Sequence, residues 1–159
     1  MDDTAPIAAA RRFLALLHQA PTPSSRKLLQ SLDELAMTYH HTPPGNPSED
    51  EATPPTTDYQ QRYASLGRRF SNYGYYAHSD PTEPLDEKGM VGDAIDDLAD
   101  IADDLEEVVW RFENLGADDA HWHYRFLFEL HWGIHLRGLA LYLHANALRA
   151  SDEDEYPTP

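Results

Sequence analysis

Cysteine is the clearest absence from this chain of 159 residues. Without cysteine the protein has no disulfide, no thiolate nucleophile and no zinc or iron–sulfur site built on sulfur ligands. Residues 1–20, MDDTAPIAAARRFLALLHQA, also lack the basic start and the unbroken apolar run of a signal peptide. We therefore expect a cytoplasmic protein.

Basic residues are scarce as well. Lysine and arginine number 12 against 28 aspartates and glutamates, which gives a formal net charge of −16. A surface of this sign repels nucleic acids and anionic membranes, so we expect neither as a partner. A basic protein is the partner that such a surface attracts.

Several sequence motifs of catalysis are missing. The chain has no glycine-rich phosphate loop and no Gly-x-Ser-x-Gly elbow. It also lacks the Glu-x-x-His repeat of di-iron bundles and the His-Glu-x-x-His of zinc peptidases. These absences favour a non-enzymatic role, although they leave a less common metal site open.

The residues that are present favour an all-α, single-domain bundle of about five helices. Apolar side chains recur at helical spacing, and no segment shows the period-two alternation of a strand. The expected helices span about 4–20, 24–39, 58–70, 91–114 and 121–148. The domain covers 1–150 and includes a loop at about 41–57, which has five prolines and three acidic residues and should be exposed and mobile. Residues 151–159 should form a disordered acidic tail.

The last helix should organise the bundle. Its apolar residues face nearly every direction, which is typical of a buried helix. Arg125, Glu129 and Arg137 make it a poor membrane span. Asp118 or Asp119 would cap its start, and its tryptophans are expected in the core or in an interface.

Two runs resemble a known bacterial family. DDLADIADDL at 96–105, followed by HWGIHLRGLALYLH at 131–144, is similar to the domain-of-unknown-function family 5063. The resemblance implies a small all-helical bacterial protein, and it supplies no catalytic residues to carry over. The proline-rich loop at 41–57 matches nothing associated with that family.

One polar cluster is a candidate site. His131 and His135 are four residues apart, so they share a helix face, and we expect them to point inward. Asp97 and Asp104 lie at the margin of the apolar stripe of the preceding helix, and an antiparallel arrangement could bring them to the histidines. The histidines would then be hydrogen-bonded core residues, ligands of a divalent metal such as Zn, Fe or Mn together with Asp97, Asp100 or Asp104, or a proton-responsive contact.

Five acidic residues, Asp100 among them, are expected on the face of the 91–114 helix that points away from its apolar stripe. They are Asp93, Asp96, Asp100, Asp103 and Glu107. Such a face is usually just solvated, but like charges this close destabilise a helix, so it could be reserved for a cationic partner. Mg²⁺-dependent pyrophosphate hydrolysis is a poorer explanation, because one helix supplies all the acids and no basic cluster awaits the phosphates.

Three functions remain open. The leading one is a non-enzymatic interaction protein without a cofactor, whose acidic face binds a basic partner; an inhibitor or an immunity-type protein is a concrete form. The alternative is a metal-dependent hydrolase with a His/Asp site inside the bundle. A further alternative is an oligomeric helical scaffold, for instance a homodimer that buries exposed aromatic side chains.

Overall fold

The computed structural model describes residues 2–85 and 89–155, with side chains as far as residue 147. Helices α1, Ala5–His18, and α2, Ser25–His41, are followed by α3, Tyr59–Arg69, and by α4, Ala94–Leu115. Helix α5, Ala117–Leu127, a π-helical turn η1, Phe128–Trp132, and α6, Gly133–Glu155, then follow one another without a break. Strands β1, Tyr75–His78, and β2, Met90–Asp93, lie between α3 and α4. The all-α, single-domain prediction is confirmed, with α5, η1 and α6 acting as the fifth helix of the bundle.

The first three helices begin where their sequences predict. Pro6 lies in the first turn of α1, where its missing N–H costs no hydrogen bond. The Ser24 side chain accepts a hydrogen bond from the Lys27 N–H at 3.2 Å, and Asp58 accepts one from the Gln61 N–H at 3.1 Å. These caps fix the starts of α2 and α3.

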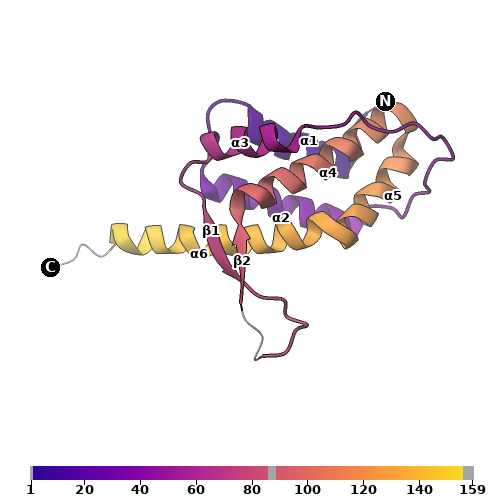
Figure 1. The fold of residues 1–159 in the computed structure, drawn as a ribbon. Coiled ribbons are helices and arrows are strands. Elements are labelled where there is room, and N and C mark those ends of the chain that lie inside the picture. Colours follow the sequence, from indigo (N-terminus) through magenta and orange to yellow (C-terminus); the bar gives the residue numbers. More distant parts are fainter. Residues whose placement is uncertain (1, 86–88, 156–159) are drawn as a thin grey trace.

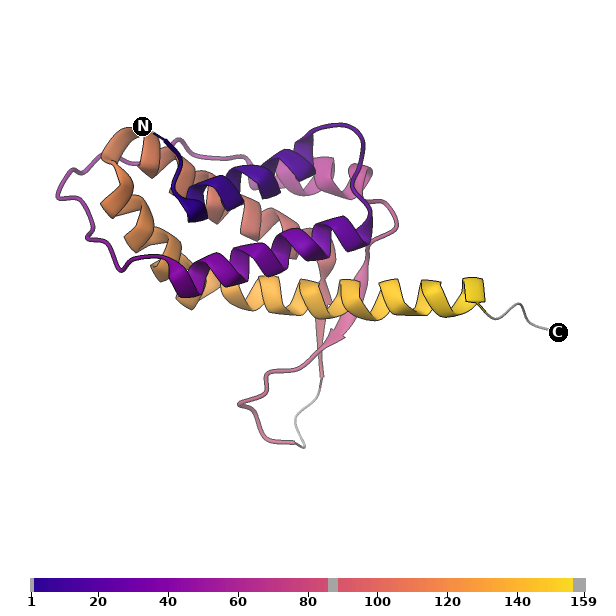
Figure 2. The same cartoon turned by 180° about the vertical axis from the view of Figure 1, so that it is seen from behind.

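The core lies between α1, α2, α4 and α6. Helix α6 packs against both α2 and α4, and α1 covers the space between those two (Figures 1 and 2). The largest fully buried side chains of the core include Phe13, Leu32, Leu98, Tyr124 and Trp132. Burial of this apolar surface is the main stabilising contribution to the fold.

A β-hairpin lies between α3 and α4, where the sequence predicts no helix or strand. Strands β1 and β2 pair antiparallel, with Tyr75 opposite Asp93 and His78 opposite Met90. The hairpin crosses α6 and projects from the bundle (Figure 1). The prediction that the chain lacks strands is therefore wrong, because each strand is only four residues long and Tyr75 and Tyr76 hide the alternation of exposed and inward positions.

Helix α4 starts later than predicted. Its expected start at Val91 falls in β2, and Asp93 is instead the residue that caps the helix. The Asp93 carboxylate accepts hydrogen bonds from the N–H groups of Ile95 and Asp96 at 2.9 and 3.4 Å. At the other end Gly116, with φ of 97°, separates α4 from α5, and Asp118 and Asp119 lie inside the first turn of α5 rather than capping it.

The last helix is buried on one side only. Trp132, Leu136, Leu139 and Leu143 enter the core, whereas Leu130, Ile134 and Leu141 are exposed. The expectation of a helix buried all round is corrected in this respect. The π-helical turn at 128–132 is a second difference, since the sequence suggests a regular helix.

The proline-rich loop is held at defined points. Most of its side chains are exposed, as expected. Its backbone nevertheless bonds to α5, from the Asn46 N–H to the Asp118 carbonyl at 3.2 Å and from the Ser48 N–H to the Asp119 carboxylate at 2.9 Å. Gly45, with φ of 63°, passes so close to Asp118 that a Cβ would lie 2.2 Å from its carbonyl oxygen.

The expected tail divides into two parts. Residues 151–155 continue α6, so the helix extends further than predicted. Residues 156–159 lie outside the described part of the chain. Among the described residues, no helix is both long enough and apolar enough to cross a membrane.

Candidate metal centre

Helices α4 and α6 bring carboxylates and imidazoles together at their packed edge. Asp97, Asp100 and Asp104 are three and four residues apart on α4, so they share one face. His131 belongs to η1 and His135 to the first turns of α6. Because the α5–α6 segment returns antiparallel to α4, Asp104 faces His131 and Asp97 faces His135.

Each histidine is held by a carboxylate through its Nδ1 atom. His131 Nδ1 lies 2.7 Å from Asp104 Oδ2, and His135 Nδ1 lies 2.8 Å from Asp97 Oδ1. An ionised carboxylate can only accept, so Nδ1 donates in both pairs. A neutral imidazole held in this way keeps an unprotonated Nε2, which is the atom that can ligate a metal.

Asp100 occupies the position between the two Nε2 atoms. Its Oδ2 lies 3.3 Å from His135 Nε2 and 3.9 Å from His131 Nε2. One ligand atom from each of the three residues lies within 4.8 Å of the others. Bonds of 2.0–2.1 Å in a tetrahedral zinc site separate ligands by about 3.4 Å, so small side-chain movements would let these atoms share one cation.

The site lies at the edge of the bundle, not in its core. The His131 side chain is 45% exposed and that of His135 is 23% exposed. The prediction that both histidines point into the core is therefore wrong. The core-facing direction of α6 is occupied by Trp132, Leu136 and Leu139, and the histidines lie on the flank that meets α4.

Burial and pairing change the acid–base properties of the cluster. Desolvation raises the pKa of Asp104 to about 6, and it also raises the pKa of Asp100, although the nearby histidines oppose that change. The hydrogen bond that His135 donates to Asp97 is the largest cause of the raised pKa of His135, and burial opposes it. Desolvated carboxylates are costly to keep ionised, and a bound cation would offset that cost.

The five acids predicted to bind a partner are all partly buried. Four of them have hydroxyl or guanidinium partners within the chain. Tyr63 donates to Asp93 at 2.6 Å, and Arg111 donates to Glu107 at 2.7 Å. Asp96 accepts from Tyr59 and Asp103 accepts from Thr57, and Asp100 is the acid between the histidines. That these residues bind a basic protein stays a prediction.

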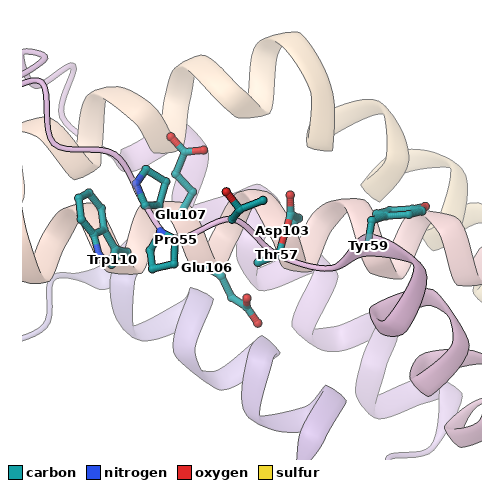
Figure 3. Close-up of a pocket in the computed structure, with 9 residues that line it drawn as sticks. Pro55, Thr57, Tyr59, Asp103, Glu106, Glu107 and Trp110 are labelled. Atoms are coloured by element: carbon teal, nitrogen blue, oxygen red, sulfur yellow. The ribbon is translucent and has the colours of Figure 1, made fainter.

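A groove runs beside part of this acidic face. The 54–57 segment crosses α4 and leaves a groove of about 540 Å³ above the helix. Asp103, Glu106, Glu107 and Trp110 line its α4 side, with Pro55 and Thr57 opposite (Figure 3). The groove therefore combines carboxylates with an indole ring, the two groups that attract organic cations.

Sequence reasoning brought the right histidines and acids together but did not assign a role to each acid. Asp97, Asp100 and Asp104 were all possible metal ligands; Asp97 and Asp104 contact the Nδ1 atoms, and Asp100 lies nearest both Nε2 atoms. Asp100 was also expected on the partner-binding face, and its spacing from Asp97 and Asp104 could have indicated that the three share one face. Tyr76, which donates to Asp97 at 2.5 Å, gave no signal because its contact depends on the hairpin.

The comparisons agree with the fold. The crystal structure of protein BF1032 from Bacteroides fragilis is similar over 98% of this chain and 92% of its own, with a TM-score of 0.69 and 19% sequence identity. At that identity the similarity shows the fold alone. No curated protein matches the chain. The model of the domain-of-unknown-function family DUF5063 matches residues 4–149. The chain therefore belongs to this family, as its two motifs suggested.

Proposed function

We propose that the protein binds a divalent metal ion through His131, His135 and Asp100 and uses it to activate water for hydrolysis. The observation that carries the proposal is the convergence of two imidazole Nε2 atoms on one carboxylate, with both Nδ1 atoms bound to further carboxylates. Carboxylates at this second position raise the basicity of the imidazole and fix its orientation. Protonated imidazoles would use the same contacts as an ion-pair network, and metal analysis separates the two arrangements.

The donor set favours Zn²⁺ or Fe²⁺ among the available ions. Two imidazoles and one carboxylate suit both metals, and three protein ligands leave at least one coordination position for water. A metal held by these residues would lower the pKa of that water towards neutrality and would so supply a hydroxide nucleophile. The partial exposure of His131 gives a substrate a route to the position.

Metal analysis of untagged protein tests the binding step. We expect about one equivalent of metal per chain, a higher melting temperature with Zn²⁺ and loss of both in His135→Ala. His144→Ala is the matched control, because His144 lies on the same helix at an exposed position outside the cluster. Wild-type protein that neither retains metal nor shifts its melting temperature on titration with Zn²⁺, Fe²⁺ or Mn²⁺ would overturn the proposal.

Hydrolysis is tested separately on metal-loaded protein. Chromogenic carboxylic esters and phosphate esters report two substrate classes, and activity should disappear in His135→Ala. Metal binding without turnover of either class would retain the metal site and remove the assignment as a hydrolase for these substrates.

A second candidate function is capture of a basic protein. It is supported by the groove beside α4, in which Asp103 and Glu107 lie near Trp110 beneath the 54–57 segment (Figure 3). An arginine side chain could meet both carboxylates and stack on the indole ring. An inhibitor or immunity-type protein would use such a groove against a basic target.

Binding of an oligo-arginine peptide tests this candidate. The Asp103→Asn/Glu107→Gln variant should bind it at least several-fold more weakly than wild type at low salt. The control Asp33→Asn/Glu83→Gln removes the same charge from exposed positions away from the groove. Equal weakening in both variants would mean that only the overall charge attracts the peptide.

A further inference from the structure

The aromatic ring of Tyr76 lies between two glycines from different elements. A Cβ on Gly92, its partner in the hairpin, would lie 2.3 Å from Tyr76 Cζ. A Cβ on Gly138 of α6 would lie 2.6 Å from the Tyr76 hydroxyl oxygen. Both positions are too close for any side chain, so the two glycines leave the space that this ring occupies.

The hydroxyl of Tyr76 connects the hairpin to the candidate metal centre. It donates to Asp97 Oδ2 at 2.5 Å, and Asp97 Oδ1 lies 2.8 Å from His135 Nδ1. Asp97 itself is only 5% exposed. Because each oxygen of the carboxylate has its own donor, the orientation of Asp97 is fixed from both sides, and the imidazole of His135 is fixed with it.

Other contacts keep this part of the hairpin against α6. The rings of Tyr76 and Tyr142 are 5.2 Å apart, and the Tyr142 hydroxyl oxygen accepts a hydrogen bond from the Gly74 N–H at 3.2 Å. The Ala94 N–H also donates to the Gly74 carbonyl at 3.1 Å. The hairpin is thus attached to both helices that carry the site.

We infer that the β1–β2 hairpin supports the metal site. Tyr76 of this hairpin is a positioning residue that holds His135 in place through Asp97. The inference rests on the proposed metal-binding function and adds a coupling to it. Metal binding and packing of the hairpin against the helices stabilise each other. The metal is bound more tightly when the hairpin holds His135 in place, so bound metal in turn favours the packed hairpin. Displacement of the hairpin would therefore weaken metal binding.

Substitution of Tyr76 by phenylalanine tests the inference. Tyr76→Phe keeps the ring and removes only the donated hydrogen bond. We expect the variant to bind Co²⁺ about 10- to 100-fold more weakly, which is the usual loss when a residue that orients a ligating histidine is changed. Binding is followed by the visible absorption of Co²⁺. The spectrum at saturation should also change. Tyr124→Phe is the matched control, because it removes a buried hydroxyl that donates at 2.9 Å to the Leu35 carbonyl, outside both the hairpin and the site.

Two further measurements separate positioning from general stability. Gly138→Ala retains the hydroxyl but displaces it, so it should also weaken Co²⁺ binding, and it should add little to Tyr76→Phe. Amide exchange should slow in Tyr75–His78 when wild-type protein binds Co²⁺, and much less in Tyr76→Phe.

The outcomes distinguish this inference from the proposed function. No Co²⁺ binding by wild-type protein would remove both. Wild-type binding with an unchanged affinity in Tyr76→Phe and in Gly138→Ala would overturn the role of the hairpin and leave the metal site. Equal weakening in Tyr76→Phe and Tyr124→Phe would likewise overturn it, because loss of any buried hydroxyl would then have the same effect.

Discussion

His121 is a buried histidine that lies outside the candidate metal centre. It is 7% exposed, and its Nε2 lies 2.9 Å from Thr4 Oγ1, so it connects α5 to the residue before α1. Burial lowers its pKa, although Asp118 acts in the opposite direction. A histidine that is kept neutral by the fold makes the folded state sensitive to acid.

The sign of this effect gives a prediction. Because the folded-state pKa is lower than the unfolded value of about 6.5, His121 stabilises the fold above that pH, and the contribution is lost as the pH falls through the lowered pKa. His121→Gln keeps a polar side chain and does not titrate. Its urea midpoint should therefore fall less than that of wild type between about pH 7.5 and about pH 5.

Exposed His144 supplies the control for this measurement. His144→Gln should follow the wild-type pH dependence. Parallel curves for wild type and His121→Gln would show that burial of this imidazole has no influence on acid stability.

At the scale of elements, the π-helical turn depends on Gly133. Its N–H donates to the Phe128 carbonyl five residues earlier, and a Cβ at this position would lie 2.3 Å from that oxygen. Turns of this kind reorient the side chains around them and often occur at functional sites. Here the turn contains His131, so the backbone at 128–133 determines where that imidazole meets Asp104.

Substitution of Gly133 by alanine should therefore be costly in two ways. We expect a loss of about 1–3 kcal/mol of unfolding free energy from the close contact, together with weaker metal binding as His131 moves. Gly67→Ala is the control in a regular helix, because a Cβ at this position would have only Ile95 Cγ2, at 3.9 Å, as a close neighbour. It should be neutral or stabilising by up to about 1 kcal/mol, since alanine favours helix. A Gly133→Ala variant as stable as Gly67→Ala would contradict the steric argument.

The elements differ in how far the sequence predicts them. Helices α1, α2 and α3 follow from apolar periodicity and from Pro6, Ser24 and Asp58 at their starts. The hairpin does not, since its strands have four residues each and are stabilised by contacts with α4 and α6. The periodicity of apolar residues within a short segment does not reveal contacts with distant elements, so it does not predict these strands.

The candidate site was predictable only in part, because it too depends on contacts between elements. Spacing places His131 and His135 on one face, and it allows Asp97 and Asp104 to reach them. Which acid meets Nδ1 and which faces Nε2 depends on the crossing of α4 and α6, and side-chain periodicity within one helix does not determine that crossing. The role of Tyr76 requires the hairpin, which the sequence did not reveal.

At the scale of the whole molecule, an exposed apolar strip lies on a highly acidic protein. Leu130, Ile134 and Leu141 are 67%, 56% and 70% exposed and lie along one side of the last helix. Exposed apolar side chains gathered on one side of a helix are typical of contact surfaces. The net charge of −16 opposes self-association, because two copies repel each other over a Debye length of about 30 Å at about 0.01 M salt.

We predict a weak homodimer that salt strengthens. The Debye length falls to about 10 Å at about 0.1 M salt, so repulsion decreases while the apolar attraction remains. Sedimentation at several protein concentrations should show more dimer at the higher salt. The Leu130→Gln/Ile134→Gln/Leu141→Gln variant should stay monomeric at both, with little change in stability because these side chains are already exposed in the monomer.

A second set of exposed apolar residues serves as a control for non-specific hydrophobic association. Leu85, Met90 and Val91 are also exposed, but Met90 and Val91 belong to β2 and Leu85 lies between β1 and β2. Their replacement by glutamine should leave the salt-dependent association unchanged, because it removes similar apolar area from a different place. If instead both triple variants lose association equally, the attraction belongs to exposed apolar area in general, and the side of α6 has no special role in bringing two copies together.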